Sequence, residues 1–232
     1  MNKKTLSEQF FEQFCGSNNI DFKPIKVGAR RLPDYRIDCS GNDVIVEVKE
    51  FDRSPHEKQL RERLKRTGRT GAVNFLSEDD GSGIPLLKLD ERVRTKIEDA
   101  VPQLQNLAGD KLPAVLVLFN KEILFDVNGV VIRLAMYDKD SVIASPSSDG
   151  TNRVMYAHQM GIMPTLNATR FTVLSAVALL SRKGDEGFQL AIYHNKFAAR
   201  PFDPDWLRID AITHCRLGDK PQEGGLIGWE LF

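Results

Sequence analysis

The spacing of hydrophobic and polar positions predicts alternating helices and strands in the first half of the chain. Apolar residues recur at helical intervals from Lys3 to Cys15, with Thr5 or Ser7 as the N-cap and Gly16 at the end. A wholly apolar run over 113–119 has the pattern of a strand that is buried on both faces. The other elements expected here are a strand over 20–27 with a break at Pro24, a hairpin within 33–50, and helices over 55–66 and 90–107.

The second half of the chain has a less regular pattern. Residues 123–135 predict one or two strands around a break at Gly129. A run rich in Val, Leu and Ala predicts a buried helix that begins at Thr165 or Asn167 and ends near Arg182. The alternation of helices and strands places the chain in the α/β class. Further strands are expected over 187–194 and 206–215.

The hairpin within 33–50 has the most informative polar pattern. A two-residue turn at 41–42 suits Gly and Asn, which tolerate positive φ, and it sets Asp34 opposite Lys49. Because side chains alternate across a strand, six residues share one face, while the opposite face is apolar and is expected to pack on the core. Five of the six are charged, more than an ordinary solvated face needs. The six are Asp34, Arg36, Asp38, Ile45, Glu47 and Lys49.

Asp34 and Glu47 on this charged face can converge on one divalent cation. Directly opposed residues are about 5 Å apart in a hairpin, and diagonal neighbours are about 7–8 Å apart. Mg²⁺ prefers oxygen ligands and needs only one or two carboxylates besides water and a substrate phosphate. Such an ion activates water, and Lys49 can orient the attacking hydroxide or stabilise the transition state. Phosphodiester hydrolysis is therefore the first function to expect.

Pro33-Asp34, a short spacer and Glu47-Val48-Lys49 resemble the motif of the PD-(D/E)XK nuclease superfamily. The pattern is most similar to Holliday-junction resolvase and RecB-type nuclease cores, and it covers roughly residues 5–120. The resemblance implies a restriction-endonuclease-like core: a helix, a mixed central sheet whose hairpin holds the motif, and a further helix and strand. Residues 1–125 would form this core and residues 126–232 a C-terminal α/β elaboration, within the same domain or beside it.

The resemblance also implies roles for individual residues. Asp34 and Glu47 would bind Mg²⁺ or Mn²⁺, and Lys49 would be the base or electrostatic stabiliser that positions water. The expected substrate is DNA, with RNA as the second choice.

The resemblance also implies candidates on the helices on either side of the hairpin. Some branches of the superfamily add an acid from the first helix, for which Glu12 is the best-placed residue and Glu8 the second. Other branches place Gln or Lys on the helix after the motif. Lys96 and Gln103 are seven residues apart there and so share one helical face.

Charge around the hairpin predicts a nucleic-acid interface, although the net charge of the chain is zero. Arg30 and Arg31 directly precede the motif and Arg53 follows it. With Lys96 they would form a basic rim whose affinity for DNA falls with salt. The basic run over 61–69 is explained equally well by a solvated helix with i,i+4 ion pairs.

Other chemistries are excluded by what the sequence lacks. It has no P-loop, no Gly-x-Ser-x-Gly pattern and no zinc spacing among its three cysteines and four histidines. An odd cysteine count without paired spacing indicates reduced thiols in a cytoplasmic protein. No apolar stretch approaches 18 residues, so no membrane span is expected. His194 at a strand end could contact a substrate, but a hydrogen-bonded structural role is favoured.

Two alternatives to a nuclease stay open. A protein that keeps this fold could bind nucleic acid, or assemble with other proteins, without cleaving anything. An ordinary α/β domain could simply carry a charged hairpin whose cross-strand ion pairs each stabilise it by about 0.2–1 kcal/mol. A homodimer is expected from the resemblance alone, and a partner protein in a defence or repair system from analogy at the level of the fold.

Overall fold

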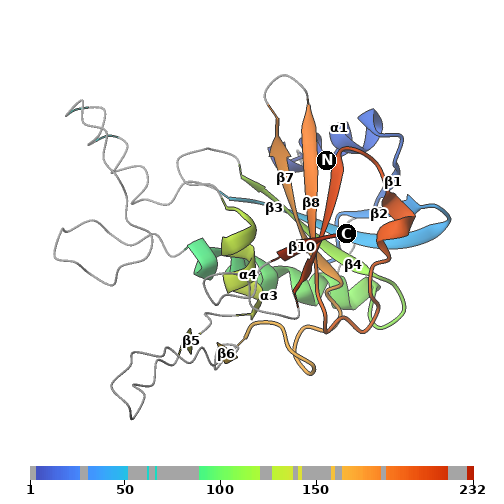
Figure 1. Cartoon of the computed structure of the whole chain (residues 1–232). Helices are drawn as coiled ribbons and strands as arrows, with labels where there is room; N and C mark the ends of the chain where they lie inside the picture. Colours follow the sequence, from blue (N-terminus) through green and yellow to red (C-terminus); the bar gives the residue numbers. More distant parts are fainter. Residues whose placement is uncertain are drawn as a thin grey trace, which may run out of the picture.

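An eight-stranded mixed sheet forms the centre of the computed structural model, in the strand order β1-β2-β3-β4-β7-β8-β9-β10 (Figure 1). The structure describes residues 4–26, 31–51, 62, 66, 89–120, 127–137, 141–142, 158–159, 164–183, 187–218 and 229–232. The helices are α1 (Leu6–Ser17), α3 (Leu89–Leu107), α4 (Gly129–Tyr137) and the 3₁₀ helix η1 (Pro204–Leu207). The strands are β1 (Asp21–Pro24), β2 (Tyr35–Cys39), β3 (Asn42–Phe51), β4 (Ala114–Asn120), β7 (Ala176–Arg182), β8 (Phe188–His194), β9 (Ile212–Leu217) and β10 (Trp229–Leu231), with β5 (Ser141–Val142) and β6 (His158–Gln159) paired separately.

Strands from both halves of the chain belong to this one sheet. β1, β2 and β3 pair antiparallel, and β3, β4 and β7 pair parallel. β7 and β8 pair antiparallel, β8 and β9 parallel, and β9 and β10 antiparallel. The α/β class and the mixed central sheet are therefore confirmed. Strands β7 to β10, all after residue 126, extend the sheet outward from β4.

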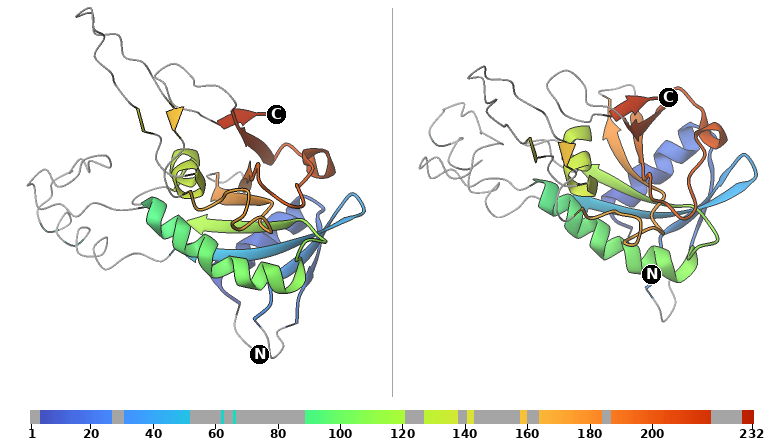
Figure 2. Two further views of the ribbon diagram at one scale, coloured as in Figure 1. Left: turned by 90° about the horizontal axis from the view of Figure 1, so that it is seen from below. Right: turned by 60° about the horizontal axis from the view of Figure 1, so that its bottom comes forward.

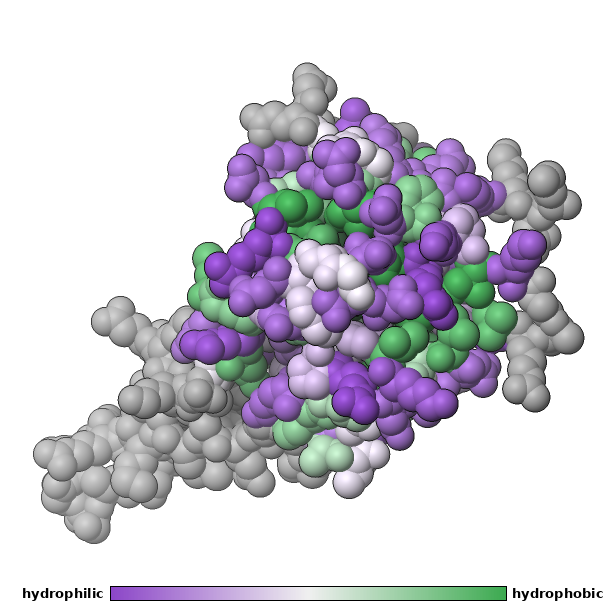
Figure 3. Space-filling model, turned by 90° about the vertical axis from the view of Figure 1, so that its right-hand side faces the viewer, coloured by the Kyte–Doolittle hydropathy of each residue, from purple (hydrophilic) through white to green (hydrophobic). Residues whose placement is uncertain are grey.

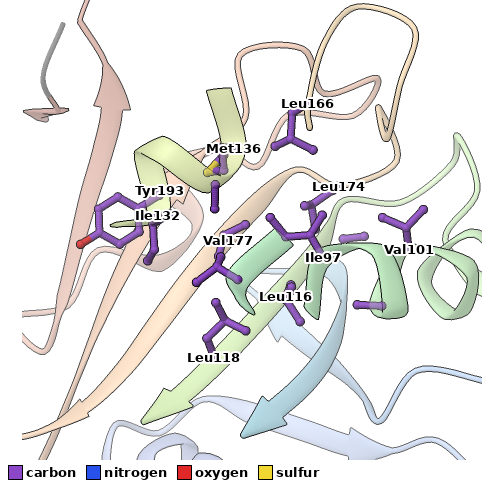
Figure 4. Packing of buried hydrophobic residues seen from close by; sticks show 14 of the residues in the cluster. Ile97, Val101, Leu116, Leu118, Ile132, Met136, Leu166, Leu174, Val177 and Tyr193 are labelled. Carbon is purple, nitrogen blue, oxygen red and sulfur yellow. The ribbon is translucent and has the colours of Figure 1, made fainter. Parts of the chain in front are cut away.

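Helices cover both faces of the sheet (Figure 2). Alternation along β4 shows the two layers: Leu116 and Leu118 pack in the cluster that contains α3 and α4, whereas Val115 and Val117 pack in the cluster that contains α1. Figure 4 shows the first cluster, where side chains of α3 and α4 meet those of β4 and β7. The expected strand over 113–119 is thus buried on both faces.

The first helix begins as the sequence predicts. Thr5 is the N-cap, and its hydroxyl accepts a hydrogen bond from the Glu8 backbone N–H at 3.2 Å. The Glu8 carboxylate accepts one from the Thr5 backbone N–H in return, which completes a capping box. The helix expected over 90–107 is α3 and keeps Pro102 in its interior.

Residues 129–137 form a helix, so the strands predicted over 123–135 are wrong where the structure describes them. Ile132, Ala135 and Met136 are buried at positions i, i+3 and i+4, while Val130 is exposed. Packing on α3 therefore outweighs the β-propensity of a segment rich in Val and Ile.

Residues 176–182 form strand β7, so the helix predicted from Thr165 or Asn167 to Arg182 is also wrong. A short apolar run fits a central strand as well as a buried helix, and only its two neighbours, β4 and β8, decide between them. Asn167 instead closes a turn, in which its side-chain oxygen accepts from the backbone N–H of Thr169 and Arg170.

The remaining predicted elements agree in part. The strand over 187–194 is β8, and the segment 206–215 contains the end of η1 and the start of β9. The strand over 20–27 shortens to β1. The helix predicted over 55–66 lies outside the described residues except for Glu62 and Arg66, and so does the predicted boundary at 125.

The capping box gives a stability prediction. Thr5→Ala removes the acceptor for the Glu8 N–H and is expected to lower the free energy of unfolding by about 1 kcal/mol. Thr5→Ser, the matched control, keeps the hydroxyl and should stay close to the wild type. Urea unfolding of the three proteins measures this, and an Ala variant as stable as the wild type would show that the cap contributes nothing.

Candidate functional site

The β2–β3 hairpin turns one residue earlier than predicted. Cys39 pairs with Asn42, so the turn residues are Ser40 and Gly41, with φ of 54° and 82°. The Asp38 carboxylate accepts a hydrogen bond from the Gly41 N–H at 2.6 Å and holds this turn. The predicted turn at 41–42 and its pairs are therefore wrong. The pairing is displaced by two residues, however, so each side chain keeps its predicted face.

The observed register brings the two predicted acids together. Tyr35 pairs with Val46, and continuing that ladder sets Asp34 opposite Glu47 instead of Lys49. Asp34 lies just before β2, where its Oδ2 accepts a hydrogen bond from the Val48 N–H at 2.8 Å. One oxygen of this carboxylate is thus tied to the neighbouring strand.

Glu47 is completely buried on β3, between Ile45 and Lys49 on one face of the strand. Ile45 and Phe51 on the same face pack in the cluster with α3. Glu47 Oε1 accepts hydrogen bonds from Lys49 Nζ and from Gln103 Nε2. Glu47 Oε2 has no hydrogen-bond partner in the described part of the chain. A buried carboxylate oxygen without a donor is costly, and it is a feature of sites that take a further ligand.

Gln103 joins the site from α3, as its place on the predicted helix suggested. It is 4% exposed, and its amide nitrogen donates to Glu47 Oε1 at 2.5 Å and to the Leu32 carbonyl at 3.2 Å. Its amide oxygen accepts from Lys49 Nζ at 3.3 Å. Gln103 therefore fixes both the acid and the lysine of the motif.

Burial makes ionisation of both acids costly. Burial, and then the charge of Asp34, raise the pKa of Glu47 to about 7, while Lys49 and Gln103 oppose that rise. Burial also raises the pKa of Asp34, as does the charge of Glu8, whereas the Val48 N–H, Lys49 and the side chain of Glu47 lower it. A cation between the two carboxylates would relieve both effects.

The acids of α1 are engaged elsewhere. Glu12 binds Lys4 Nζ at 2.7 Å and accepts from the Tyr35 hydroxyl at 2.9 Å, on the face of the sheet opposite to Glu47. Glu8, the second choice, is the acid whose charge reaches Asp34, although its carboxylate also serves the helix cap.

The predicted basic rim is described only in part. Lys96 is half-buried on α3, between Gln103 at the site and Arg92, whose guanidinium lies over the Phe51 ring at 5.5 Å. Arg31 is exposed, and its carbonyl accepts from Asn106. Arg30 and Arg53 lie outside the described residues.

One pair of polar residues was not found by sequence reasoning. His194 Nε2 and His214 Nδ1 lie 3.0 Å apart, and His214 Nε2 contacts the Leu207 carbonyl at 3.2 Å. Burial lowers the pKa of His194 to about 4 and also lowers that of His214. The pair agrees with the structural role favoured for His194. Their separation on β8 and β9 left no signal in the sequence.

The donor set suits a hard divalent cation more than a transition metal. Among the described residues, no group of three or more His, Cys, Asp and Glu side chains could hold a metal ion. Two neighbouring carboxylates with one unpaired oxygen nevertheless meet the need of Mg²⁺, which retains water and shares its ligands with a substrate phosphate.

Comparison with known proteins adds no relative: no protein-family model, no curated protein and no solved structure matches the chain. None of the helices in the described part of the chain is long and apolar enough to cross a membrane.

The raised pKa of Glu47 makes stability depend on pH in the metal-free protein. Its carboxyl pKa is about 7 when folded, against 4.5 for an ordinary Glu, so folding favours the protonated form. The stabilisation that protonated Glu47 gives the folded state is therefore fully present below about pH 4.5 and is lost as the pH rises to 7. Melting temperatures in chelator should fall for the wild type relative to Glu47→Gln between pH 5 and pH 8.

The control is Glu98→Gln, which changes an exposed acid on α3. The difference in melting temperature between Glu98→Gln and the wild type should be constant over the same pH range. A constant difference for Glu47→Gln as well would contradict the raised pKa.

Proposed function

We propose that this protein is a metal-dependent nuclease of the PD-(D/E)XK type that hydrolyses phosphodiester bonds in DNA, with RNA as the second substrate. The observation that carries the proposal is the unpaired, buried Oε2 of Glu47 next to Asp34, with Lys49 two residues away on the same face. A purely structural hairpin gains nothing from a fully buried carboxylate whose second oxygen lacks a donor.

The carboxylates are held in a way that suits metal binding. Val48 N–H holds Oδ2 of Asp34, and Lys49 with Gln103 holds Oε1 of Glu47. Each acid is therefore fixed through one oxygen and keeps the other for a ligand. Hydrogen bonds to the free side of a ligating group orient it, as a metal site requires.

The residues of the site divide the chemistry among themselves. Asp34 and Glu47 would hold Mg²⁺ or Mn²⁺, which lowers the pKa of water and offsets charge on the phosphate. Lys49 brings a fixed positive charge to the position where negative charge develops on the phosphate oxygens. Gln103 keeps the ammonium of Lys49 and the carboxylate of Glu47 in place.

The arrangement of the first half supports the proposal. The order α1-β1-β2-β3-α3-β4, with an antiparallel hairpin followed by a parallel strand, is the order that the resemblance implies. α1 and α3 lie on opposite faces of the sheet, and α3 brings Gln103 to the motif. A homodimer and a partner protein in defence or repair stay predictions.

Cleavage of circular single-stranded and double-stranded DNA tests the activity. With Mg²⁺ or Mn²⁺ the wild type should cut, whereas Lys49→Ala should lose at least about a hundredfold in rate because the charge at the reacting phosphate is gone. Lys111→Ala removes an exposed lysine after α3 and should cut normally.

If the wild type and both variants cleave no more than background on DNA, and then on RNA, the proposal that this protein is a nuclease is contradicted. Labelled DNA that is retarded in chelator and stays intact with Mg²⁺ would favour the binding or assembly module instead.

Metal binding can be measured separately from cleavage. Calorimetric titration with Mn²⁺ should show binding to the wild type that disappears in Asp34→Asn, because one of the two ligands loses its charge. Asp21→Asn removes an exposed acid of β1 and should bind as the wild type does. Identical titrations for all three proteins would mean that Asp34 is not a ligand.

A further inference from the structure

Two basic side chains lie beside the proposed site on the same face of the sheet. Lys23 of β1 and Arg36 of β2 are direct cross-strand neighbours. Arg36 follows Asp34 by two residues, so alternation turns it and Lys23 to the face that holds Asp34 and Glu47. At about 3.4 Å per residue, this basic pair is about 7 Å along the strand from Asp34.

A pocket of about 280 Å³ opens at this pair. The hairpin projects beyond the end of α3 here, so the helix that covers Glu47 leaves this part of the sheet open (Figure 2). Figure 3 shows the side on which the hairpin lies, where hydrophilic residues cover much of the surface between smaller hydrophobic groups. The pocket is lined by Asp21, Phe22, Lys23, Arg36, Ile37, Asp38 and Asp43.

The charges in the pocket are ordered in rows across the strands. Asp38 pairs with Asp21 on one side and with Asp43 on the other, so the acids form one row near the hairpin turn. Lys23 and Arg36 form the next row, between those acids and Asp34. An anion is therefore attracted to the basic row and repelled by the row at the turn.

The basic row has charge available for a ligand. Arg36 Nη1 lies 3.1 Å from Asp43 Oδ2, but both side chains are more than 40% exposed, so water screens this pair strongly. Lys23 makes no ion pair within the described ranges. Like charges directly opposite each other in a sheet are destabilising, and a bound anion would remove that cost.

We infer that Lys23 and Arg36 bind a backbone phosphate of the substrate strand, next to the phosphate that is cut. The inference rests on the proposed function and adds a path: the substrate strand runs along β2 from Asp34 as far as Lys23 and Arg36. The contact is to the phosphodiester backbone and carries no base specificity. It also supplies the positive charge that a nucleic acid needs beside two carboxylates.

Binding of a fluorescent single-stranded DNA oligonucleotide in chelator tests the subsite without cleavage. Its dissociation constant is measured over a range of NaCl concentrations for the wild type, Lys23→Ala, Arg36→Ala and Lys111→Ala. Lys23→Ala and Arg36→Ala should each weaken DNA binding about three- to tenfold. Each should also lower the slope of log affinity against log salt concentration by about 1. Lys111→Ala should match the wild type. Wild-type affinity and slope in Lys23→Ala and Arg36→Ala would overturn the inference.

In the same assay, Asp43→Asn should tighten DNA binding, because it removes the acid that pairs with Arg36. In the cleavage assay, Lys23→Ala should raise KM and leave kcat within about twofold. If cleavage needs Lys49 but Lys23→Ala leaves KM unchanged, the phosphate subsite is contradicted and the nuclease proposal stands. If DNA binding needs Lys23 but no substrate is cleaved, the nuclease proposal is contradicted and the subsite stands.

Discussion

The arrangement of the site depends on one buried carboxylate in the interior of the sheet. Glu47 is 0% exposed and lies in a row with Ile45 and Phe51, where the core would take an apolar side chain. Placing it there requires Lys49 and Gln103 to hold one of its oxygens, and it leaves the other without a donor. The sheet thus contains a local cost that protonation of Glu47 or a bound cation would lower.

Neighbouring elements are positioned around this carboxylate. The segment before β2 places Asp34 opposite Glu47 where the β2–β3 ladder is continued, and it also contributes the Leu32 carbonyl. α3 lies on the same face, so Gln103 reaches Glu47. The open part of the same face begins where α3 ends, beside Lys23 and Arg36. A closed acidic centre and an open polar surface therefore lie on one face of the sheet.

Much of the site could be predicted from residues that are close in sequence. The alternation of β2 and β3 assigned Asp34, Glu47 and Lys49 to one face even with the wrong turn, because a two-residue slip preserves the face of every side chain. Gln103 followed from the resemblance, which implies a Gln or Lys on the helix after the motif, and that helix is α3. Glu12 does not lie at this site, because α1 places its side chain against the Tyr35 hydroxyl and Lys4.

The sequence by itself determined the capped first helix, the hairpin with its charged face, and the buried strand β4, because these patterns lie within one element. Only the tertiary structure decided that 129–137 is a helix and 176–182 a strand, since apolar runs take the form that their neighbours allow. It also decided the contact of His194 with His214 and the pairing of Lys23 with Arg36. Such contacts join residues far apart in sequence, and only the register between strands brings them together.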